Sequence, residues 1–291
     1  MIVVKLMGGL GNQLFQYALG RHLAIINNCE LVLDTTSLKY KGEKPNPSFT
    51  DREYQLSNFN IDARVADEKL LKKVNNRPTG LKRLFQKEYT KFFENGNQFQ
   101  QEMLSLKKNS ILEGYWQSEK YFIDIKNILK KEFTLKNTSS SENLEVAKLI
   151  TQSKSVSMHV RRGDYVNNPI FSGYIGVNCL KYYSDTVSYI NSKCENPTYF
   201  IFSDDIKWTK ENFGFIKNKV VYVDINSELN CFEDIYLMSL CNHNIIANSS
   251  FSWWGAWLNQ NRDNIVVASN TWFNESSFVN KDMLPECWIK I

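Results

Sequence analysis

The chain alternates short runs of hydrophobic residues with longer segments in which hydrophobic residues recur at helical spacing. It opens on the run IVVKLM (2–7), the glycine turn GGLGNQ (8–13), a helical pattern over 12–28 and a second apolar run, ELVLD (30–34). A strand, a loop, a helix and a second strand in this order predict the start of a parallel α/β sheet.

The second half of the chain returns to the same rhythm after the polar, serine-rich stretch 135–143, which has the composition of a linker. Helical spacing marks 179–193 and 231–241. Five short apolar runs predict strands at 155–160, 198–202, 219–223, 243–247 and 264–268. We therefore expect an α/β protein of two domains, 1–145 and 146–291.

Composition indicates a packed globular protein, because 43% of the 291 residues are hydrophobic. The formal charge of +4 does not by itself indicate nucleic acid, and no RNA- or DNA-binding motif accompanies it. The basic run 69–91 indicates either a solvated helix face or a peripheral contact with an anionic membrane. No targeting segment or membrane span is evident, so we expect a bacterial, cytoplasmic protein, at most peripheral to the inner membrane. The six scattered cysteines are typical of reduced core residues.

The sequence lacks the common metal and cofactor motifs. Its three histidines lie far apart, and no Asp-x-Asp occurs. The glycines of GGLGNQ are too close together for GxGxxG, and there is no GxxxxGK[ST]. We therefore predict neither a bound metal nor a cofactor.

Polar clusters follow four of the predicted strands. They are GGLGNQ (8–13), HVRRGDY (159–165), SDD (203–205) and NSSFSWW (248–254). Because the carboxyl ends of strands form the ligand crevice of open α/β sheets, we expect the clusters to meet at one cleft.

The second and fourth clusters together predict a metal-free diphosphate clamp. Arg161 and Arg162 offer bidentate donors for phosphate, and a helix that begins at Ser249 or Ser250 offers free backbone amides. The alternative is that either arginine pairs with Asp164 or another acid and only fixes the turn.

Other side chains have two readings each. Asp204 and Asp205 either accept from ribose hydroxyls or a base edge, or cap the next helix. Asp234 either caps a helix or accepts from the N1–H and 2-amino group of guanine, and the sequence alone favours capping. Helical spacing of the tryptophans favours the core for all three, Trp253, Trp254 and Trp257.

Four segments together carry a family resemblance. GGLGNQLFQYALGRHLA, LEGYWQSEKYF, HVRRGDY and NSSFSWWGAWL resemble the bacterial branch of the α-1,2-fucosyltransferases, glycosyltransferase family 11. The resemblance implies a GT-B fold, with an acceptor-side and a GDP-fucose-binding Rossmann-like domain facing across a cleft. It implies inverting, metal-independent transfer from GDP-β-L-fucose to the 2-hydroxyl of galactose in an oligosaccharide or lipid-linked glycan.

The resemblance also assigns roles to single residues. It places Arg161 on the diphosphate, His159 at the nucleotide, Asp234 on guanine, and Asn12 facing the donor from the first domain. It assigns phosphate to Ser249 and Ser250 and the nucleotide to Asp204 and Asp205. Their motif neighbours Gly11, Arg162 and Phe251 are expected to bind the donor with them.

The catalytic base does not follow from the resemblance. A glutamate serves as base in the α-1,6 relatives, and Pro169 stands at that position here. We therefore group Asp164, the nearest acid, with His159 and Arg161 as the expected catalytic residues. On the acceptor side the expected contacts are Tyr115, Trp116 or Glu119, with a core role for the two aromatic side chains as the equal alternative. Two alternatives remain at this stage: a GDP-sugar transferase of another linkage or acceptor, and a non-catalytic GDP-sugar-binding module.

Overall fold

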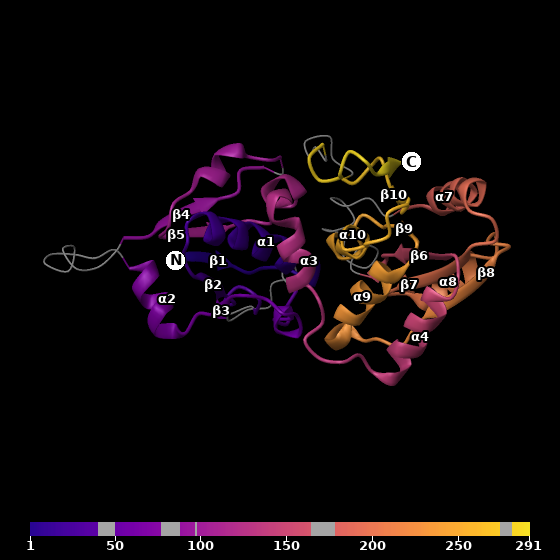
Figure 1. Ribbon diagram of the computed structural model, residues 1–291, viewed down its shortest axis with the longest axis horizontal. Coiled ribbons are helices and arrows are strands. Elements are labelled where there is room, and N and C mark those ends of the chain that lie inside the picture. The colour runs from indigo at the N-terminus through magenta and orange to yellow at the C-terminus, as the bar shows by residue number, and fades with distance from the viewer. Residues whose placement is uncertain (40–49, 77–87, 97, 164–177, 274–280) are drawn as a thin grey trace, which may run out of the picture. The chain divides into compact units, whose positions relative to one another are not determined.

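The computed structural model describes the chain except residues 40–49, 77–87, 97, 164–177 and 274–280 (Figure 1). It divides into two compact units. The first comprises Met1–Lys136 and Lys281–Met283, and the second comprises Asn137–Asn280 and Leu284–Ile291. The division between Lys136 and Asn137 lies within the predicted linker. Helix α4 (Ser141–Thr151), which spans the boundary expected at 145/146, belongs to the second unit.

The first unit is built on a parallel sheet with the strand order β3-β2-β1-β5-β4. Within the described ranges its strands are β1 (Ile2–Lys5), β2 (Leu31–Asp34), β3 (Arg64–Val65), β4 (Thr90–Phe93) and β5 (Ser110–Glu113). Its helices are α1 (Leu10–Ile26), α2 (Glu68–Asn75) and α3 (Lys126–Glu132), with 3-10 turns η1 (Leu56–Asn58), η3 (Gln101–Ser105), η4 (Glu119–Tyr121) and η5 (Ile123–Ile125).

Helix α1 packs closely on the first two strands because Gly20 has no side chain. A Cβ at Gly20 would stand 2.4 Å from Val4 Cγ2 and 2.8 Å from Leu31 Cδ1. On the same helix, His22 is buried with Nδ1 2.6 Å from the carbonyl oxygen of Tyr121. That contact ties α1 to η4 and gives His22 a structural role.

The second unit also contains one parallel sheet, with the order β11-β10-β9-β6-β7-β8. Its described strands are β6 (Ser155–Val160), β7 (Thr198–Ser203), β8 (Lys219–Val223), β9 (His243–Ile245), β10 (Val266–Ala268) and β11 (Ile289–Lys290). Its helices beside α4 are α7 (Leu180–Lys193), α8 (Ile206–Asn212), α9 (Phe232–Leu240) and α10 (Ser250–Trp257), with the turn η6 (Glu228–Asn230). The five strands predicted for this half are therefore confirmed, although β9 and β10 are shorter than their apolar runs.

The tryptophans of α10 belong to the core, as the sequence predicts. Trp253 and Trp254 are 0% exposed and Trp257 is 4% exposed. Helices α9 and α10 pack together, and a Cβ at Gly255 would stand only 2.8 Å from Met238 Cβ. This close packing holds α10 directly against α9.

The cysteine prediction holds only in part. All six cysteines are free thiols, but Cys241 alone is buried, and Cys179 and Cys287 are exposed. The expectation of six core cysteines is therefore wrong, because their spacing carried no information on burial.

The basic run lies partly outside the described residues. Its first part forms α2, on which Val74 is the buried residue and the lysines lie in solvent.

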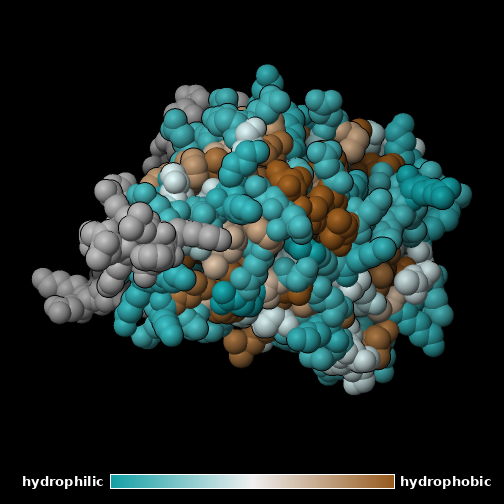
Figure 2. Space-filling model, turned by 60° about the vertical axis from the view of Figure 1, so that its left-hand side comes forward, coloured by the Kyte–Doolittle hydropathy of each residue, from teal (hydrophilic) through white to brown (hydrophobic). Residues whose placement is uncertain are grey.

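The visible face of the molecule is mostly hydrophilic (Figure 2). Among the described residues, no helix has the length and apolar character needed to cross a membrane.

Candidate active site

Three of the four polar clusters lie at one edge of the second sheet. Strands β9, β6 and β7 are neighbours, and all strands run parallel. The segments that follow them, which begin at Ile246, Arg161 and Asp204, therefore leave the sheet at the same edge. These three clusters therefore share one edge, as predicted, whereas their meeting at a cleft stays a prediction. The fourth, GGLGNQ, follows β1 in the first unit.

The turn after β6 is organised by the carboxylate of Asp204. One oxygen, Oδ1, accepts from the Arg162 amide at 2.8 Å, and Oδ2 accepts from the Gly163 amide at 2.9 Å. Oδ2 also lies 3.0 Å from Arg161 Nη1. The guanidinium of Arg161 thus has a fixed position at the sheet edge. The acid of this contact follows β7, the next strand of the sheet, and the motif's own Asp164 lies outside the described residues.

Arg162 makes a different set of contacts. Its guanidinium carbon lies 3.6 Å from the ring centroid of Trp208 on α8, a cation–π arrangement. Its Nε lies 3.4 Å from Asp205 Oδ2. Asp205 is itself the N-cap of α8, where its Oδ1 accepts from the Trp208 amide at 3.1 Å. These contacts give Arg162 and Asp205 defined roles in the fold, whereas their predicted contact with the nucleotide stays a prediction.

His159 ends β6 in a closed environment. Its side chain is 5% exposed, and its ring lies 5.5 Å from that of Phe251 at the start of α10. Burial, and then the nearby charge of Arg161, lower the pKa of His159 to about 3. Within the described residues, the buried Nδ1 atom has no hydrogen-bond partner. The side chain is therefore a neutral imidazole at physiological pH, with one buried ring nitrogen that is not yet engaged.

Helix α10 begins where the sequence predicts. Ser249 is the N-cap, and its hydroxyl oxygen accepts from the Phe251 amide at 3.3 Å. The Ser249 amide donates to the carbonyl of Ala247 at 2.7 Å. Ser249 is thus engaged locally, and Ser250 is the first residue of the helix, whose positive end lies at the same edge as Arg161.

Asp234 lies in the first turn of α9, which follows β8 and so begins at this edge of the sheet. Its Oδ1 accepts from Asn226 Nδ2 at 2.7 Å. Burial raises the pKa of Asp234 to about 7, an effect that Glu233 adds to and the Asn226 hydrogen bond opposes. The sequence favoured Asp234 as a helix cap, and this prediction is wrong, because Cys231 stands at the N-cap position of α9 and the cap has no side-chain hydrogen bond. Since the Asn226 bond engages only Oδ1 of Asp234, the other oxygen, Oδ2, remains for a ligand.

In the first unit, Gly11 and Asn12 lie in the first turn of α1. Asn12 Oδ1 accepts from Gln117 Nε2 at 2.7 Å, which ties the glycine turn to the loop after β5. Gln16 reinforces this tie, since its Nε2 donates to the carbonyl of Gly114 at 3.1 Å. The predicted contact between Asn12 and the donor stays a prediction.

The loop after β5 is held by an acid that the sequence analysis missed. The two oxygens of Glu94 accept from the backbone amides of Tyr115 and Trp116 at 2.6 and 2.9 Å. Burial raises the pKa of Glu94, and the two amides oppose that shift. Trp116 is fully buried at a φ of 56°, a backbone conformation that a bulky residue rarely adopts. Tyr115 is 43% exposed at the same loop and is open to a ligand.

Asn226 and Trp208 were also missed. Asn226 stands in DINSELN, directly after the predicted strand 219–223. The rule that polar clusters follow strands would have found it had it been applied to every strand. The contact of Trp208 with Arg162 had no signal in the sequence, because it depends on how α8 packs beside β6.

Comparison with known proteins agrees with this geometry. The model of Glycosyl transferase family 11 matches residues 1–291. An Escherichia coli α-1,2-colitosyltransferase is 34% identical and covers 100% of this chain and 98% of its own length. An Escherichia coli O-antigen biosynthesis glycosyltransferase, WbnK, is 32% identical over 98% of this chain and 99% of its own.

More distant relatives share parts of the chain or the fold. The galactoside α-(1,2)-fucosyltransferase 1 of Ateles belzebuth is 27% identical over 62% of this chain and 52% of its own length. A structure of an Arabidopsis thaliana FUT1 mutant with GDP superposes with a TM-score of 0.51 and 10% identity. It covers 99% of this chain and 75% of that one. With the two parallel sheets, this likeness confirms the predicted GT-B fold class of two Rossmann-like domains.

Proposed function

The chain belongs to glycosyl transferase family 11, and we propose that it transfers L-fucose from GDP-β-L-fucose to the 2-hydroxyl of a galactose acceptor. Transfer inverts the configuration at the anomeric carbon, gives an α-1,2 linkage and needs no metal ion. The observation that carries this proposal is the grouping of Arg161, His159, Asp234 and the start of α10 at one edge of one sheet.

The diphosphate of the donor is assigned to Arg161 and the start of α10. The Asp204 contact at 3.0 Å holds the Arg161 guanidinium before the donor arrives, so little orientation is lost on binding. A fixed cation and a helix N-terminus both stabilise phosphate charge. One well-placed donor of this kind is worth about 3–4 kcal/mol when charge develops in the transition state.

The reaction is a single displacement at C1 of fucose. The acceptor oxygen forms the new bond to C1 as the bond from C1 to the β-phosphate oxygen breaks. The electron pair of that bond leaves with GDP, where Arg161 and the α10 terminus offset the growing negative charge. The proton of the acceptor hydroxyl passes to a base.

His159 is poorly suited to be that base, because a pKa of about 3 leaves it little affinity for a proton at neutral pH. We assign it instead to a hydrogen bond with the donor through its neutral ring. Asp164, the nearest acid, lies in a segment outside the described residues, and the base is not assigned. Diphosphate is a good leaving group, so a late proton transfer to a weak base is sufficient.

The test is direct transfer by the purified chain. GDP-fucose is offered with lactose, lacto-N-biose or N-acetyllactosamine, and the product is analysed by mass spectrometry and linkage analysis. An α-1,2-fucosylated product formed at the same rate with and without EDTA supports the proposal. Another linkage, or a strict requirement for Mn²⁺, contradicts it.

A second donor deserves the same assay because one relative at 34% identity is an α-1,2-colitosyltransferase. Colitose is L-fucose without its 3-hydroxyl, so the two GDP-sugars differ in a single group. A higher kcat/KM for GDP-colitose than for GDP-fucose would identify GDP-colitose as the preferred donor. Tight GDP binding without transfer or donor hydrolysis would instead indicate a binding module.

A further inference from the structure

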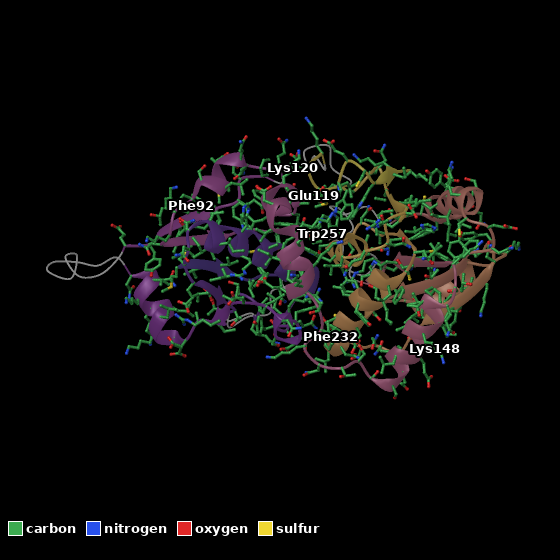
Figure 3. The ribbon with its side chains drawn as sticks, viewed as in Figure 1. Phe92, Glu119, Lys120, Lys148, Phe232 and Trp257 are labelled. Atoms are coloured by element: carbon green, nitrogen blue, oxygen red, sulfur yellow. The ribbon has the colours of Figure 1, made fainter. Side chains whose placement is uncertain are left out.

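Beside Asp234 lies a network of asparagine side chains that no assigned role explains. Asn226 follows β8, Asn230 ends η6, and Asn143 lies on α4, which packs against α9. Figure 3 labels Lys148 on α4 and Phe232, the first residue of α9, and so locates the two helices. Asn143 is only 1% exposed, so this network is built into the unit and is not a chance surface contact.

All four hydrogen-bonding positions of the Asn226 amide are used. Its Nδ2 donates to Asp234 Oδ1 at 2.7 Å and to Asn143 Oδ1 at 2.9 Å. Its Oδ1 accepts from Asn143 Nδ2 at 2.9 Å and from Asn230 Nδ2 at 2.7 Å. Asn226 and Asn143 therefore form a reciprocal amide pair, and Asn226 has no freedom to turn without losing bonds.

A backbone amide fixes the direction of the whole chain of bonds. The amide of Ser227, which can only donate, points at Asn230 Oδ1 at 2.6 Å. The other atom of that side chain, Nδ2, must then donate to Asn226, whose Oδ1 must accept. The Nδ2 of Asn226 is therefore directed at Asp234, and the reverse orientation would set two pairs of donors against each other.

Asp234 is thereby held through one oxygen, Oδ1, which leaves Oδ2 for recognition. Among the residues that the structure describes, Oδ2 of Asp234 accepts no hydrogen bond. Guanine presents two parallel donors, N1–H and the 2-amino group, which match the two oxygens of an oriented carboxylate. We propose that Asn226 is a positioning residue that orients Asp234 for guanine, and so sets the preference for a guanine nucleotide; this rests on the proposed function.

The same contact supports the anionic form of Asp234. Burial raises its pKa to about 7, Glu233 adds to that rise, and the Asn226 hydrogen bond opposes it. The charged residues of α4, Glu142, Glu145 and Lys148, are exposed, and α10 carries none. Because guanine binds the anion, GDP binding should release a proton near pH 7, and loss of Asn226 should move that release to higher pH.

The experiment compares Asn226→Leu with the wild-type chain by titration calorimetry with GDP and with IDP, which lacks the 2-amino group. We expect GDP affinity to fall about 10–100-fold, the range for a hydrogen bond to a charged group. The ratio of GDP to IDP affinity should fall as well, and the pH at which the proton is released should rise. The kcat at saturating donor should change less than twofold, since the guanine ring lies at the opposite end of the donor from the reacting sugar carbon.

A matched control is Asn191→Leu, which also removes an asparagine that bonds to two side chains, Asn218 and Tyr199, but on α7. It should retain wild-type GDP affinity. If Asn226→Leu fails to fold, Asn230→Ala removes one donor to Asn226 Oδ1 while leaving its bond to Asp234. That variant should weaken GDP binding about threefold or more.

Two results overturn the inference. One is a folded Asn226→Leu chain with wild-type GDP affinity and an unchanged GDP-to-IDP ratio. The other is an equal loss of affinity for GDP and for IDP that the Asn191→Leu variant also shows. Asp234→Asn separates the inference from its premise: if this variant also binds GDP normally, the guanine assignment fails with it. A wild-type chain that does not bind GDP refutes the proposed function as well.

Discussion

Replacing Gly163 with alanine should displace the carboxylate that organises the turn after β6. An added Cβ would stand 2.6 Å from Asp204 Oδ2, about 0.8 Å short of the 3.4 Å at which ordinary contact begins. That oxygen accepts from the Gly163 amide at 2.9 Å and lies 3.0 Å from Arg161 Nη1. The carboxylate cannot retreat from residue 163 by that amount and keep its bond to the same residue's amide.

The expected magnitude follows from this displacement. Overpacking of this kind costs about 1–3 kcal/mol of folding stability. A catalytic group that moves by about 1 Å loses about 100-fold in rate. Because Arg161 takes its position from Asp204, we expect kcat/KM of Gly163→Ala to fall about 10–100-fold.

The assay measures GDP release with donor and acceptor, together with thermal unfolding by circular dichroism. Gly214→Ala is the matched control, because a Cβ there meets no heavy atom within 4 Å. It should stay within about 0.5 kcal/mol of the wild-type stability. If Gly163→Ala matches Gly214→Ala in both kcat/KM and unfolding temperature, the role given to Asp204 is wrong.

Three further outcomes are expected. Arg161→Lys should lower kcat by about 100-fold, because an ammonium on a flexible stem cannot reproduce the oriented fork; unchanged single-turnover rates would contradict this. Burial raises the pKa of Asp234 from 3.8 to about 7, so the folded chain binds more protons than the unfolded chain between these values, and its stability falls as pH rises through that window. Asp234→Asn removes this loss, so its unfolding temperature without nucleotide should exceed that of the wild type above pH 7 and match it below about pH 4. Glu94→Gln removes one of the two carboxylate oxygens that accept from the backbone amides of the loop after β5 and should cost about 1–3 kcal/mol of stability. It should raise the KM for the sugar acceptor and leave GDP affinity unchanged. Weakened GDP binding would contradict the acceptor-side role of this loop.

Hydrophobic periodicity was sufficient to predict the parallel α/β architecture, and polar, serine-rich composition indicated the linker. Strand 155–160 and strand 219–223 agree with the structure at both ends. Their regularity follows from physics that acts locally, since a buried parallel strand needs a short run of apolar residues bounded by polar ones. The rule that ligands bind beyond the carboxyl ends of strands then placed Arg161, His159 and Ser249 at one edge.

The partners of these residues were beyond the reach of the sequence. The sequence offered Asp164 or another acid as the partner of the arginines, and the structure gives Asp204 to Arg161 and Asp205 to Arg162. Such a pairing depends on the register of β6 beside β7, which sets Val160 opposite Ser203. Register is a property of the whole sheet, so a linear pattern cannot reveal which acid meets which base.

Burial decided the chemistry of the remaining groups. A histidine and an aspartate in a sequence have ordinary pKa values, whereas the folded chain lowers that of His159 to about 3 and raises that of Asp234 to about 7. The asparagine network around Asn226 likewise joins Asn143 of α4 to Asn226, which lies 83 residues further along the chain and bonds to η6 and α9. The sequence by itself thus singled out Arg161, His159 and the start of α10 as candidates. The tertiary structure added Asn226 and Trp208 and decided partners and charges, because desolvation and side-chain contact exist only once the elements have packed.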